Sequence, residues 1–349
     1  MQVIKLRLRD KHSAELNRQA RAVNFVWNYC NETQQKAARA HRKWLTAVDL
    51  QRLTAGASKD LNLHAHTIQK VCQQYDRSRS AKRKPWLRFR GRKSLGWVPF
   101  NKGHVTVIEP GKVKFRGVVY ETMHWRDIPE GTVICAGSFN QDARGRWYVN
   151  LPVELPDEAF AKSGETTVGI DLGLKDIATL STGEKIENPR HFAKHAERYG
   201  KAQRAGKKRL ARNIAAKIAN CRKDHLHKAS ARIALAHGVI VVGNVSSAKL
   251  ARTRMAKSVL DAGWSMLRKQ LEYKAIRHGS WFVEVNEAYT SQTCSACGSL
   301  PDGRPKGIAG LEVRRWHCSE CGAEHDRDVN AALNIARLGL ETLAEGASA

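Results

Sequence analysis

Acidic residues and long apolar runs are both scarce in this chain. Its 349 residues include 33 Asp and Glu against 60 Lys and Arg, so the formal net charge is +27 and the pI is near 10.1. This balance excludes an acidic-surface enzyme. It makes a nucleic acid the leading partner, because an anion offsets the self-repulsion of so much positive charge. No stretch approaches the ~20 apolar residues of a membrane helix, so we expect no membrane partner.

The remaining composition is that of a folded protein. Hydrophobic residues make up 42% and charged residues 27%, which excludes a disordered tail protein. The length predicts two to three domains. Residues 1–8 alternate apolar and basic side chains, a pattern that favours a strand over a signal peptide, and we therefore expect a cytoplasmic location. The eight cysteines favour metal ligation or burial there, and a disulfide miniprotein is excluded.

The hydrophobic periodicity changes at about residue 160. Residues 1–10 and 95–160 carry short β-like runs separated by turn residues, typical of a small β-barrel, and residues 11–94 carry helical spacing. Residues 161–290 and 325–349 alternate strands and helices in an α/β order, which a mixed sheet flanked by helices satisfies. The expected strands of this second half are 166–170, 176–180, 185–186, 239–242 and 281–285, and its expected helices are 191–236, 256–277 and 329–343.

Two CxxC pairs lie between the last expected strand and the last expected helix. Cys294 and Cys297 form the first pair, and Cys318 and Cys321 form the second after 20 intervening residues. Two such pairs supply the four sulfurs that zinc prefers, with no open position, so we expect a structural Zn²⁺ in a ribbon over residues 291–324. A redox dithiol is the alternative. Gly298 and Gly322 follow the pairs and relieve the backbone there. The other cysteines are expected to be buried: Cys30, Cys72, Cys135 and Cys221.

Two aspartates mark a second candidate site. Asp171, in Gly-Ile-Asp-Leu-Gly, ends an apolar strand, and Asp328 lies in the first turn of the last expected helix. Phosphodiester hydrolysis by two divalent ions requires several converging carboxylates, because hard cations take oxygen ligands. A solvated carboxylate is the alternative for Asp171. Asp326, two residues before Asp328, is expected to cap the helix.

The second half resembles the TnpB family. The resemblance rests on Gly169–Gly173, the basic stretch around Cys221–Lys228, Tyr289–Gly298 with its first cysteine pair, and the run DRDVNAA from residue 326. TnpB proteins are OrfB-type transposases, transposon-encoded RNA-guided DNA endonucleases related to type V CRISPR effectors. The resemblance implies an RNase H-like, RuvC-type nuclease domain over 161–290 and 325–349. It also implies a wedge barrel over 1–10 and 95–160 with a helical recognition insert over 11–94.

The same resemblance implies the partners and the reaction. The protein would act in transposition in the bacterial cytosol or nucleoid, binding a guide RNA from the transposon end and a double-stranded DNA target beside a short flanking motif. Asp171 and Asp328 would be the first and last ligands of two Mg²⁺ ions, with Mn²⁺ as a substitute. Residues Tyr289–Gln292 either position a nucleic-acid strand or form a simple turn.

One position departs from the family pattern. The strand after the basic helix usually ends in glutamate, and here it reads Val241-Val242-Gly243-Asn244. Glu287, 44 residues downstream of Gly243, ends the next strand, and some relatives resemble this arrangement with a relocated glutamate. We therefore predict Glu287 as the third catalytic ligand. Glu284 is a poor substitute, because the two-residue period of a strand turns it to the opposite face.

Basic residues gather in two tracts. Residues 77–93 carry nine Lys and Arg and no acid, with Trp86 and Phe89 between them; residues 201–232 carry eleven Lys and Arg and one acid. A solvated surface is the alternative to phosphate binding. The predicted nucleic-acid contacts are Arg77, Arg79, Lys82, Arg83, Lys84, Arg88, Arg90, Arg92, Lys93, Lys207, Lys208, Arg209, Arg222 and Lys223.

Two other functions remain open at this point. The missing glutamate at position 243 is compatible with a nuclease-inactive, RNA-guided DNA-binding repressor. The cysteine pairs and the basic charge are also compatible with a plain zinc-ribbon DNA-binding protein that uses no guide RNA.

Overall fold

The chain forms two compact units, Met1–Ala159 and Phe160–Ala349. The computed structural model describes residues 2–125, 127–156, 164–245, 256–306, 310 and 312–347. The change of periodicity expected at about residue 160 therefore falls within 157–163, outside the described residues. Within the described part, no helix is both long and apolar enough to cross a membrane.

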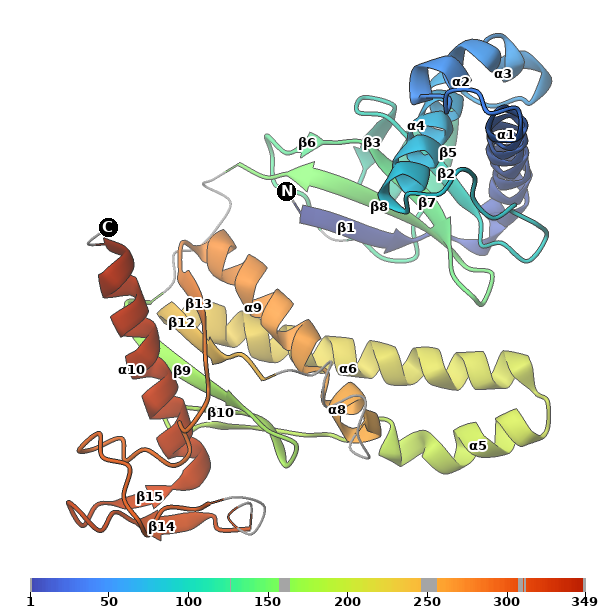
Figure 1. Cartoon of the computed structure of the whole chain (residues 1–349). Helices are drawn as coiled ribbons and strands as arrows, with labels where there is room; N and C mark the ends of the chain where they lie inside the picture. Colours follow the sequence, from blue (N-terminus) through green and yellow to red (C-terminus); the bar gives the residue numbers. More distant parts are fainter. Residues whose placement is uncertain are drawn as a thin grey trace. The chain divides into compact units, whose positions relative to one another are not determined.

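The first unit contains two open antiparallel sheets (Figure 1). The larger has the order β1-β8-β7-β2, with β6 also paired to β8. The smaller has the order β3-β4-β5, and a single bridge, Leu8 to Thr122, links β1's end to it. The bounds are β1 (Gln2–Arg7), β2 (Trp97–Phe100), β3 (Val105–Glu109), β4 (Lys112–Phe115), β5 (Val118–Glu121), β6 (Val133–Ile134), β7 (Gly137–Gln141) and β8 (Trp147–Glu154).

The prediction of a small β-barrel is wrong for the described residues, because the larger sheet stays open between β1 and β2. Its apolar side chains share one buried core with two helices: Leu6 and Leu151 of the sheet are buried in the same cluster as Val23 and Val71. Because helices cover this face, the sheet does not have to close on itself to remove its apolar residues from water.

Along the chain, the helices of the first unit come after β1 and before β2. They are α1 (Ser13–Arg39), α2 (Ala47–Leu53), α3 (Ala57–Asp60) and α4 (Ala65–Ala81), with a short 3-10 turn at Asp10–His12. The helical spacing expected in α1 is confirmed, since Leu16, Ala20, Val23 and Cys30 are all buried. Gly56, with φ of 84°, separates α2 from α3. Such a left-handed backbone conformation favours glycine and interrupts the helix there.

The second unit is built on a five-stranded mixed sheet of order β11-β10-β9-β12-β13. Strands β9 (Thr166–Leu172), β12 (His237–Gly243) and β13 (Trp281–Val285) are parallel, and β10 (Asp176–Leu180) and β11 (Lys185–Glu187) pair antiparallel. All five expected strands are present, so the predicted α/β order of this half is confirmed.

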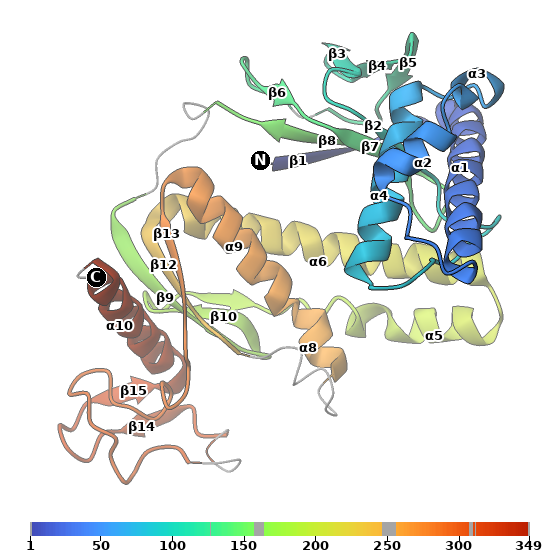
Figure 2. The ribbon, with the colours of Figure 1, turned by 45° about the horizontal axis from the view of Figure 1, so that its top comes forward.

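Helices cover both faces of this sheet (Figures 1 and 2). On one face, α6 (Lys208–Ala236), α8 (Ala256–Ala262) and α9 (Trp264–His278) share a core with Val168 and Ile170 of β9. On the other face, α10 (Arg327–Ala347) packs on Val241 of β12 and Val285 of β13 through Ile335. Two expected helices are interrupted: α5 (Ala196–Arg204), after a 3-10 turn at Ala193–His195, is separate from α6, and Gly263 separates α8 from α9.

Helix α10 lies unusually close to the sheet. A Cβ added to Gly169 of β9 would lie 2.0 Å from the carbonyl oxygen of Ala332, and one added to Gly339 would lie 2.3 Å from the side chain of Val241. Because glycine has no side chain, the backbones of helix and strand can approach closely at these two contacts. The first turn of α10 is thereby held against the carboxyl end of β9. A two-stranded hairpin, β14 (Arg315–His317) and β15 (Glu324–Asp326), precedes α10.

Candidate functional site

The three predicted acidic residues gather at one edge of the second unit's sheet, on the face covered by α10. Because β9, β12 and β13 are parallel, their carboxyl ends lie at the same edge. Side chains alternate along a strand, so Asp171 shares the face of Gly169, which contacts α10. Asp328 lies in the first turn of α10. All three carboxylates, including that of Glu287, are half-buried.

Glu287 occupies the space beside the position where the family pattern has glutamate. A Cβ added to Gly243 would lie 2.5 Å from Oε2 of Glu287 and 3.2 Å from its Cβ. The carboxylate of Glu287 therefore lies directly over the backbone of Gly243. A side chain at 243 would require Glu287 to shift, by moving the flexible end of its side chain and by a few tenths of an ångström at its Cβ. The Glu287 carboxylate therefore lies where a side chain at 243 would begin.

Glu284 faces the other way, as the strand period predicts. It is exposed and lies 3.6 Å from Nη1 of Arg268, on α9. It therefore belongs to the opposite face of the sheet and has no part in the acidic site.

The charges of Asp328 and Glu287 act on Asp171 at this edge. Burial, together with the charges of Asp328 and Glu287, raises the pKa of Asp171 to about 7, and Arg327 opposes the rise. Burial also raises the pKa of Glu287, although Arg268 and the backbone N–H of Val245 act against it. Carboxylates that repel one another in a partly desolvated site are a functional-site signature, since a bound cation would relieve the repulsion.

The residues around Asp328 orient it. Asp326 accepts hydrogen bonds from the backbone N–H groups of Asp328 (3.0 Å) and Val329 (3.1 Å), so the expected helix cap is confirmed. It also pairs with Lys185 at 2.7 Å. Asp328 itself lies 3.3 Å from Nη1 of Arg314. A metal ion at Asp328 would compete with this guanidinium.

The three carboxylates are spread more widely than ligands of one small ion. Among the described residues, only a set of four cysteines and a set of three histidines have ligand atoms that all lie within 4.8 Å of one another. The three carboxylates therefore do not form a single closed site like the cysteine set; two ions in two-metal sites lie ~3.5–4 Å apart. Oxygen donors of this kind suit Mg²⁺ or Mn²⁺.

Two asparagines that the sequence reasoning missed hold the segment after Glu287. Asn330 and Asn334 of α10 each donate to the carbonyl oxygens of Thr290 and Thr293, at 2.7–3.1 Å. Thr290 donates in turn to the carbonyl oxygen of Glu287 at 2.8 Å. Because Asn330 and Asn334 are four residues apart, both lie on one face of the helix. The segment 290–293 is thus tied to the helix that carries Asp328.

The four cysteines of the CxxC pairs meet in the ribbon. The sulfurs of Cys294 and Cys321 are 3.6 Å apart, and those of Cys297 and Cys318 are 3.7 Å apart. A tetrahedral zinc with Zn–S bonds of ~2.3 Å requires sulfurs about 3.8 Å apart, so the donor set fits a zinc ion.

The backbone around these cysteines has the expected form. Gly298 and Gly322 have φ of 76° and 73°, and their N–H groups bond to the carbonyl oxygens of Cys294 and Cys318, each at 2.9 Å. Elsewhere, Cys30 and Cys72 are buried as expected, and Cys135 and Cys221 are half-buried.

Most of the predicted nucleic-acid contacts are exposed, and three are engaged inside the protein. Arg79 is buried and pairs with Asp76 at 2.7 Å. Arg222 pairs with the buried Asp261 at 2.8 Å. Arg90 donates to Asn24 at 2.6 Å. These three position the chain, and we leave them out of the proposed interface. The exposed ones are Arg77, Lys82, Arg83, Lys84, Arg88, Arg92, Lys93, Lys207, Lys208, Arg209 and Lys223.

Three asparagines of α1 hold the first basic tract, and the sequence reasoning missed them. Asn31 exchanges hydrogen bonds with the backbone of Leu87 at 2.7 and 2.8 Å, and Asn28 does the same with Arg90. Asn24 accepts from the Arg90 side chain. Their spacing of three and four residues puts them on one face of α1, where they hold an extended segment. Phe89, between the held residues, is 48% exposed.

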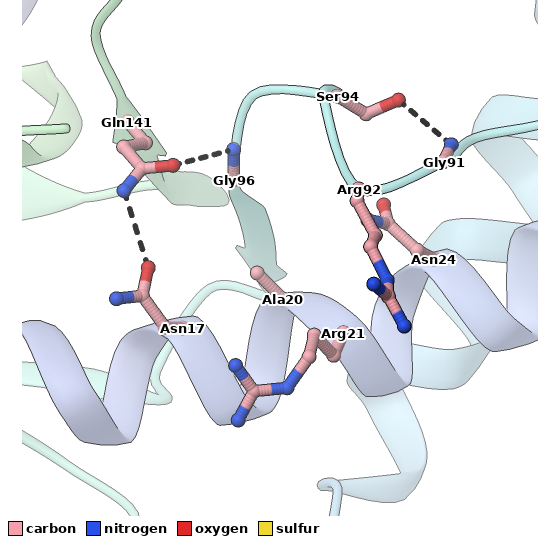
Figure 3. A pocket seen from close by; sticks show the side chains of 9 residues that line it. All are labelled: Asn17, Ala20, Arg21, Asn24, Gly91, Arg92, Ser94, Gly96 and Gln141. Carbon is pink, nitrogen blue, oxygen red and sulfur yellow. Dashed lines mark hydrogen bonds between the residues drawn. The ribbon is translucent and has the colours of Figure 1, made fainter. Parts of the chain in front are cut away.

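The same face of α1 borders a hollow of about 340 Å³. Figure 3 shows Gln141 bridging Asn17 and the backbone of Gly96, while the guanidinium groups of Arg21 and Arg92 face the hollow. In the part of the chain that the structure describes, neither guanidinium has a hydrogen-bond or ion-pair partner. An adjoining hollow is lined by Phe25, which is 61% exposed. Guanidiniums beside an exposed aromatic ring suit a nucleic-acid strand.

Two family models match the second unit and the segment before it. The model described as "Probable transposase" matches residues 150–254. The model described as "Cas12f1-like, TNB domain" matches residues 264–335, which include the four cysteines and Asp328.

Curated relatives match over nearly the full length. A "Putative RNA-guided DNA endonuclease" of Streptomyces pristinaespiralis is 31% identical over 97% of this chain and 88% of its own. A "Putative RNA-guided DNA endonuclease InsQ" of Escherichia coli strain K12 is 25% identical over 99% of this chain and 94% of its own. The solved "Cryo-EM structure of the Cas12f1-sgRNA-target DNA complex" covers 96% of this chain and 98% of that chain, at 17% identity and a TM-score of 0.38. On the near-complete sequence match to the Streptomyces protein, the chain belongs to the TnpB family of transposon-encoded proteins.

Proposed function

We propose that this protein is an RNA-guided DNA endonuclease that cleaves target DNA beside a short flanking motif, with Asp171, Glu287 and Asp328 as the metal ligands. The observation that carries the proposal is the position of the Glu287 carboxylate over Gly243. It supplies an acid at the location where the family pattern has one. The near full-length relatives, named as RNA-guided DNA endonucleases, support the guide RNA and the DNA target.

The chemistry follows from the donor set. Two divalent ions bound at such a site supply an activated water and stabilise the departing 3′ oxygen. The chain's own part is to hold the carboxylates in place. Asp171 is fixed by the sheet, Asp328 by the cap at Asp326, and Glu287 by the loop tied to α10. The cysteine set would hold a structural Zn²⁺, which keeps this loop and α10 together.

Exposed basic residues would bind the sugar–phosphate backbones of guide and target. The first unit offers the tract held along α1 and the hollow with Arg21 and Arg92; the second offers residues 207–209 and 223. Such contacts are independent of sequence and weaken with salt, so target choice would come from base pairing with the guide.

The test begins with the bound RNA. The protein is expressed together with the DNA that flanks its gene, and the co-purifying RNA is sequenced. We expect one discrete RNA that extends from the transposon end. A protein that binds DNA but retains no discrete RNA is instead a plain zinc-ribbon binder, and the proposal fails.

The second stage measures cleavage by the purified complex with Mg²⁺. Asp171→Asn should abolish cleavage and leave DNA binding intact, while Glu284→Gln, on the opposite face of β13, should cleave at the wild-type rate. If the wild-type complex binds its target and never cuts it, the protein is the inactive guided repressor. If Asp171→Asn cuts normally, the site assignment is wrong.

A further inference from the structure

Three histidines of the first unit form a cluster that the proposed nuclease function does not use. His64 precedes α4 as its N-cap residue, and His66 lies in the first turn of that helix. His104 follows β2, after the turn at Gly103, whose φ is 80°. The ring centroids of His64 and His66 lie 4.5 and 4.6 Å from that of His104, and 5.1 Å from each other. One nitrogen from each ring lies within 4.8 Å of the others.

The elements that carry these rings are joined to one another. Thr67, next to His66, donates from its hydroxyl to the carbonyl oxygen of Pro99 in β2 at 2.9 Å, and both ends of this bond are buried. The amide of His104 bonds to the carbonyl oxygen of Asn101 at 3.3 Å. The cluster is therefore held by a helix start and a strand end that already contact each other. Ligands on joined elements need little ordering when an ion binds.

One ring nitrogen in the cluster has no partner among the described residues. Nδ1 of His66 is buried and makes no hydrogen bond. A buried polar atom without a partner is unfavourable, and a water or an ion normally satisfies it. One nitrogen of His64 and one of His104 lie within 4.8 Å of a ring nitrogen of His66. The unpartnered atom and the convergence of the rings are separate observations, and both point to a bound species.

The donor set indicates which species fits. Among the described residues, the site offers imidazole nitrogens and no carboxylate. Arg116, which donates to the carbonyl oxygen of Asn62 at 2.8 Å, adds positive charge beside His64. Hard cations such as Mg²⁺ and Ca²⁺ need oxygen ligands, so they are excluded. Imidazole suits Zn²⁺, Ni²⁺, Co²⁺ and Cu²⁺. Three such ligands leave a coordination position for water or a further donor.

We propose that His64, His66 and His104 form a binding site for a divalent transition-metal ion, separate from the cysteine site. Binding has one identifiable cost. The backbone N–H of His66 donates to Nδ1 of His64 at 3.2 Å, which leaves the proton of the neutral ring on Nε2. His64 gives up this cap bond whichever of its nitrogens binds the ion. The bond is at the long end of the normal range, so the exchange removes a weak interaction.

The experiment uses the untagged full chain, freed of nucleic acid at high salt and loaded with one equivalent of Zn²⁺ at the cysteines. Co²⁺ is the probe, because it ranks below Zn²⁺ in affinity and leaves the cysteine site loaded. We expect one equivalent of Co²⁺ to bind, with a visible spectrum of nitrogen ligation and no thiolate charge-transfer band. Calorimetry gives the stoichiometry and the affinity.

Three variants complete the test. His104→Ala removes a ligand from a turn. His64→Asn removes a ligand while keeping a residue that caps helices well, so α4 should remain folded. Each should weaken Co²⁺ binding by more than about 100-fold, above the 10–100-fold cost of losing an outer partner of a metal ligand. His124→Ala, an exposed histidine of the same unit, should bind as the wild type does.

The proposal is overturned if the zinc-loaded wild type binds no Co²⁺, or if His104→Ala and His64→Asn, shown by circular dichroism to be folded, retain wild-type affinity. Cleavage is not measured, so the outcome is independent of the nuclease proposal.

Discussion

Exchanging the residues at positions 243 and 287 should move the third acidic ligand without losing it. Gly243 has an ordinary backbone conformation, since its φ is not positive, so another residue can be accommodated by the backbone. Glu287 occupies the space that a side chain there would need. A Cβ added at position 243 would lie 2.5 Å from the carboxylate of Glu287 and 3.2 Å from its Cβ. Replacing Glu287 by glycine removes both obstacles. The double variant Gly243→Glu/Glu287→Gly then returns the carboxylate to the location of the family pattern.

The structure also sets the size of the expected effects. Gly243→Glu alone forces a side chain into occupied space and adds a like charge, so we expect a loss of about 1–3 kcal/mol in the free energy of unfolding. Glu287→Gly alone removes a ligand and should lower the cleavage rate by at least about 100-fold, as does removal of a group that stabilises a transition state directly. The double variant should recover at least about tenfold of that loss. The two changes are therefore strongly non-additive.

The assay compares single-turnover cleavage of one target by the four guide-loaded proteins, with thermal melting as the stability measure. A contact of Ile335, 3.3 Å from the added Cβ, remains in the double variant, so its melting temperature should lie slightly below that of the wild type. Cleavage by Glu287→Gly at the wild-type rate would show that Glu287 is not a metal ligand. A double variant that is folded and binds target, but is no more active than Glu287→Gly, would show that position 243 cannot supply the ligand.

Three further predictions concern charge, zinc and nucleic acid. In the folded protein the pKa of Asp171 is raised from 3.8 to about 7. Its contribution to the free energy of unfolding is therefore full below pH 3.8 and is lost as the pH rises through 7. The loss amounts to up to about 4 kcal/mol. Asp171→Asn should therefore raise the melting temperature of metal-free protein more at pH 8 than at pH 4, in scanning calorimetry; an equal change at both would contradict this. Cys318→Ser should abolish stoichiometric zinc and, with it, cleavage, as metal analysis and the cleavage assay would show; retained zinc would contradict the four-sulfur site. Arg21→Ala and Arg92→Ala should each weaken binding of single-stranded RNA and reduce the salt dependence of its log affinity by a slope of about 1. Arg39→Ala, at the exposed end of the same helix, should do neither. The same salt slope for all three variants would exclude the hollow as an RNA-binding site.

The periodic parts of this fold were predictable from the sequence. The strands and helices of the second unit follow from alternation and helical spacing, and the structure departs mainly where Gly206 and Gly263 interrupt long helical patterns. The barrel prediction was wrong because a local sequence pattern carries too little information to predict a closed sheet. An alternating strand shows which face is buried, and it does not show whether a second strand or a helix covers that face.

The basic tracts show the same limit. Density of charge in the sequence predicted an anion-binding surface, and most of these side chains are indeed exposed. Arg79 and Arg222 nevertheless pair with Asp76 and Asp261. A pairing of Arg222 with an acid 39 residues away depends on how two helices pack, which no local count of charge reveals.

The candidate ligands could be recognised from residue type and spacing alone. The four cysteines, Asp171 at a strand end and Asp328 at a helix start are recognisable because residue type and spacing are local properties. The position of Glu287 over Gly243 follows from the packing of the folded chain. Among the described residues, helices α8 and α9 lie between them along the chain, and a parallel pairing of β12 with β13 brings them together. Gly243 leaves a space without a side chain, and the carboxylate of Glu287 fills it from the loop that follows β13. This relation becomes visible only when both strands are in place.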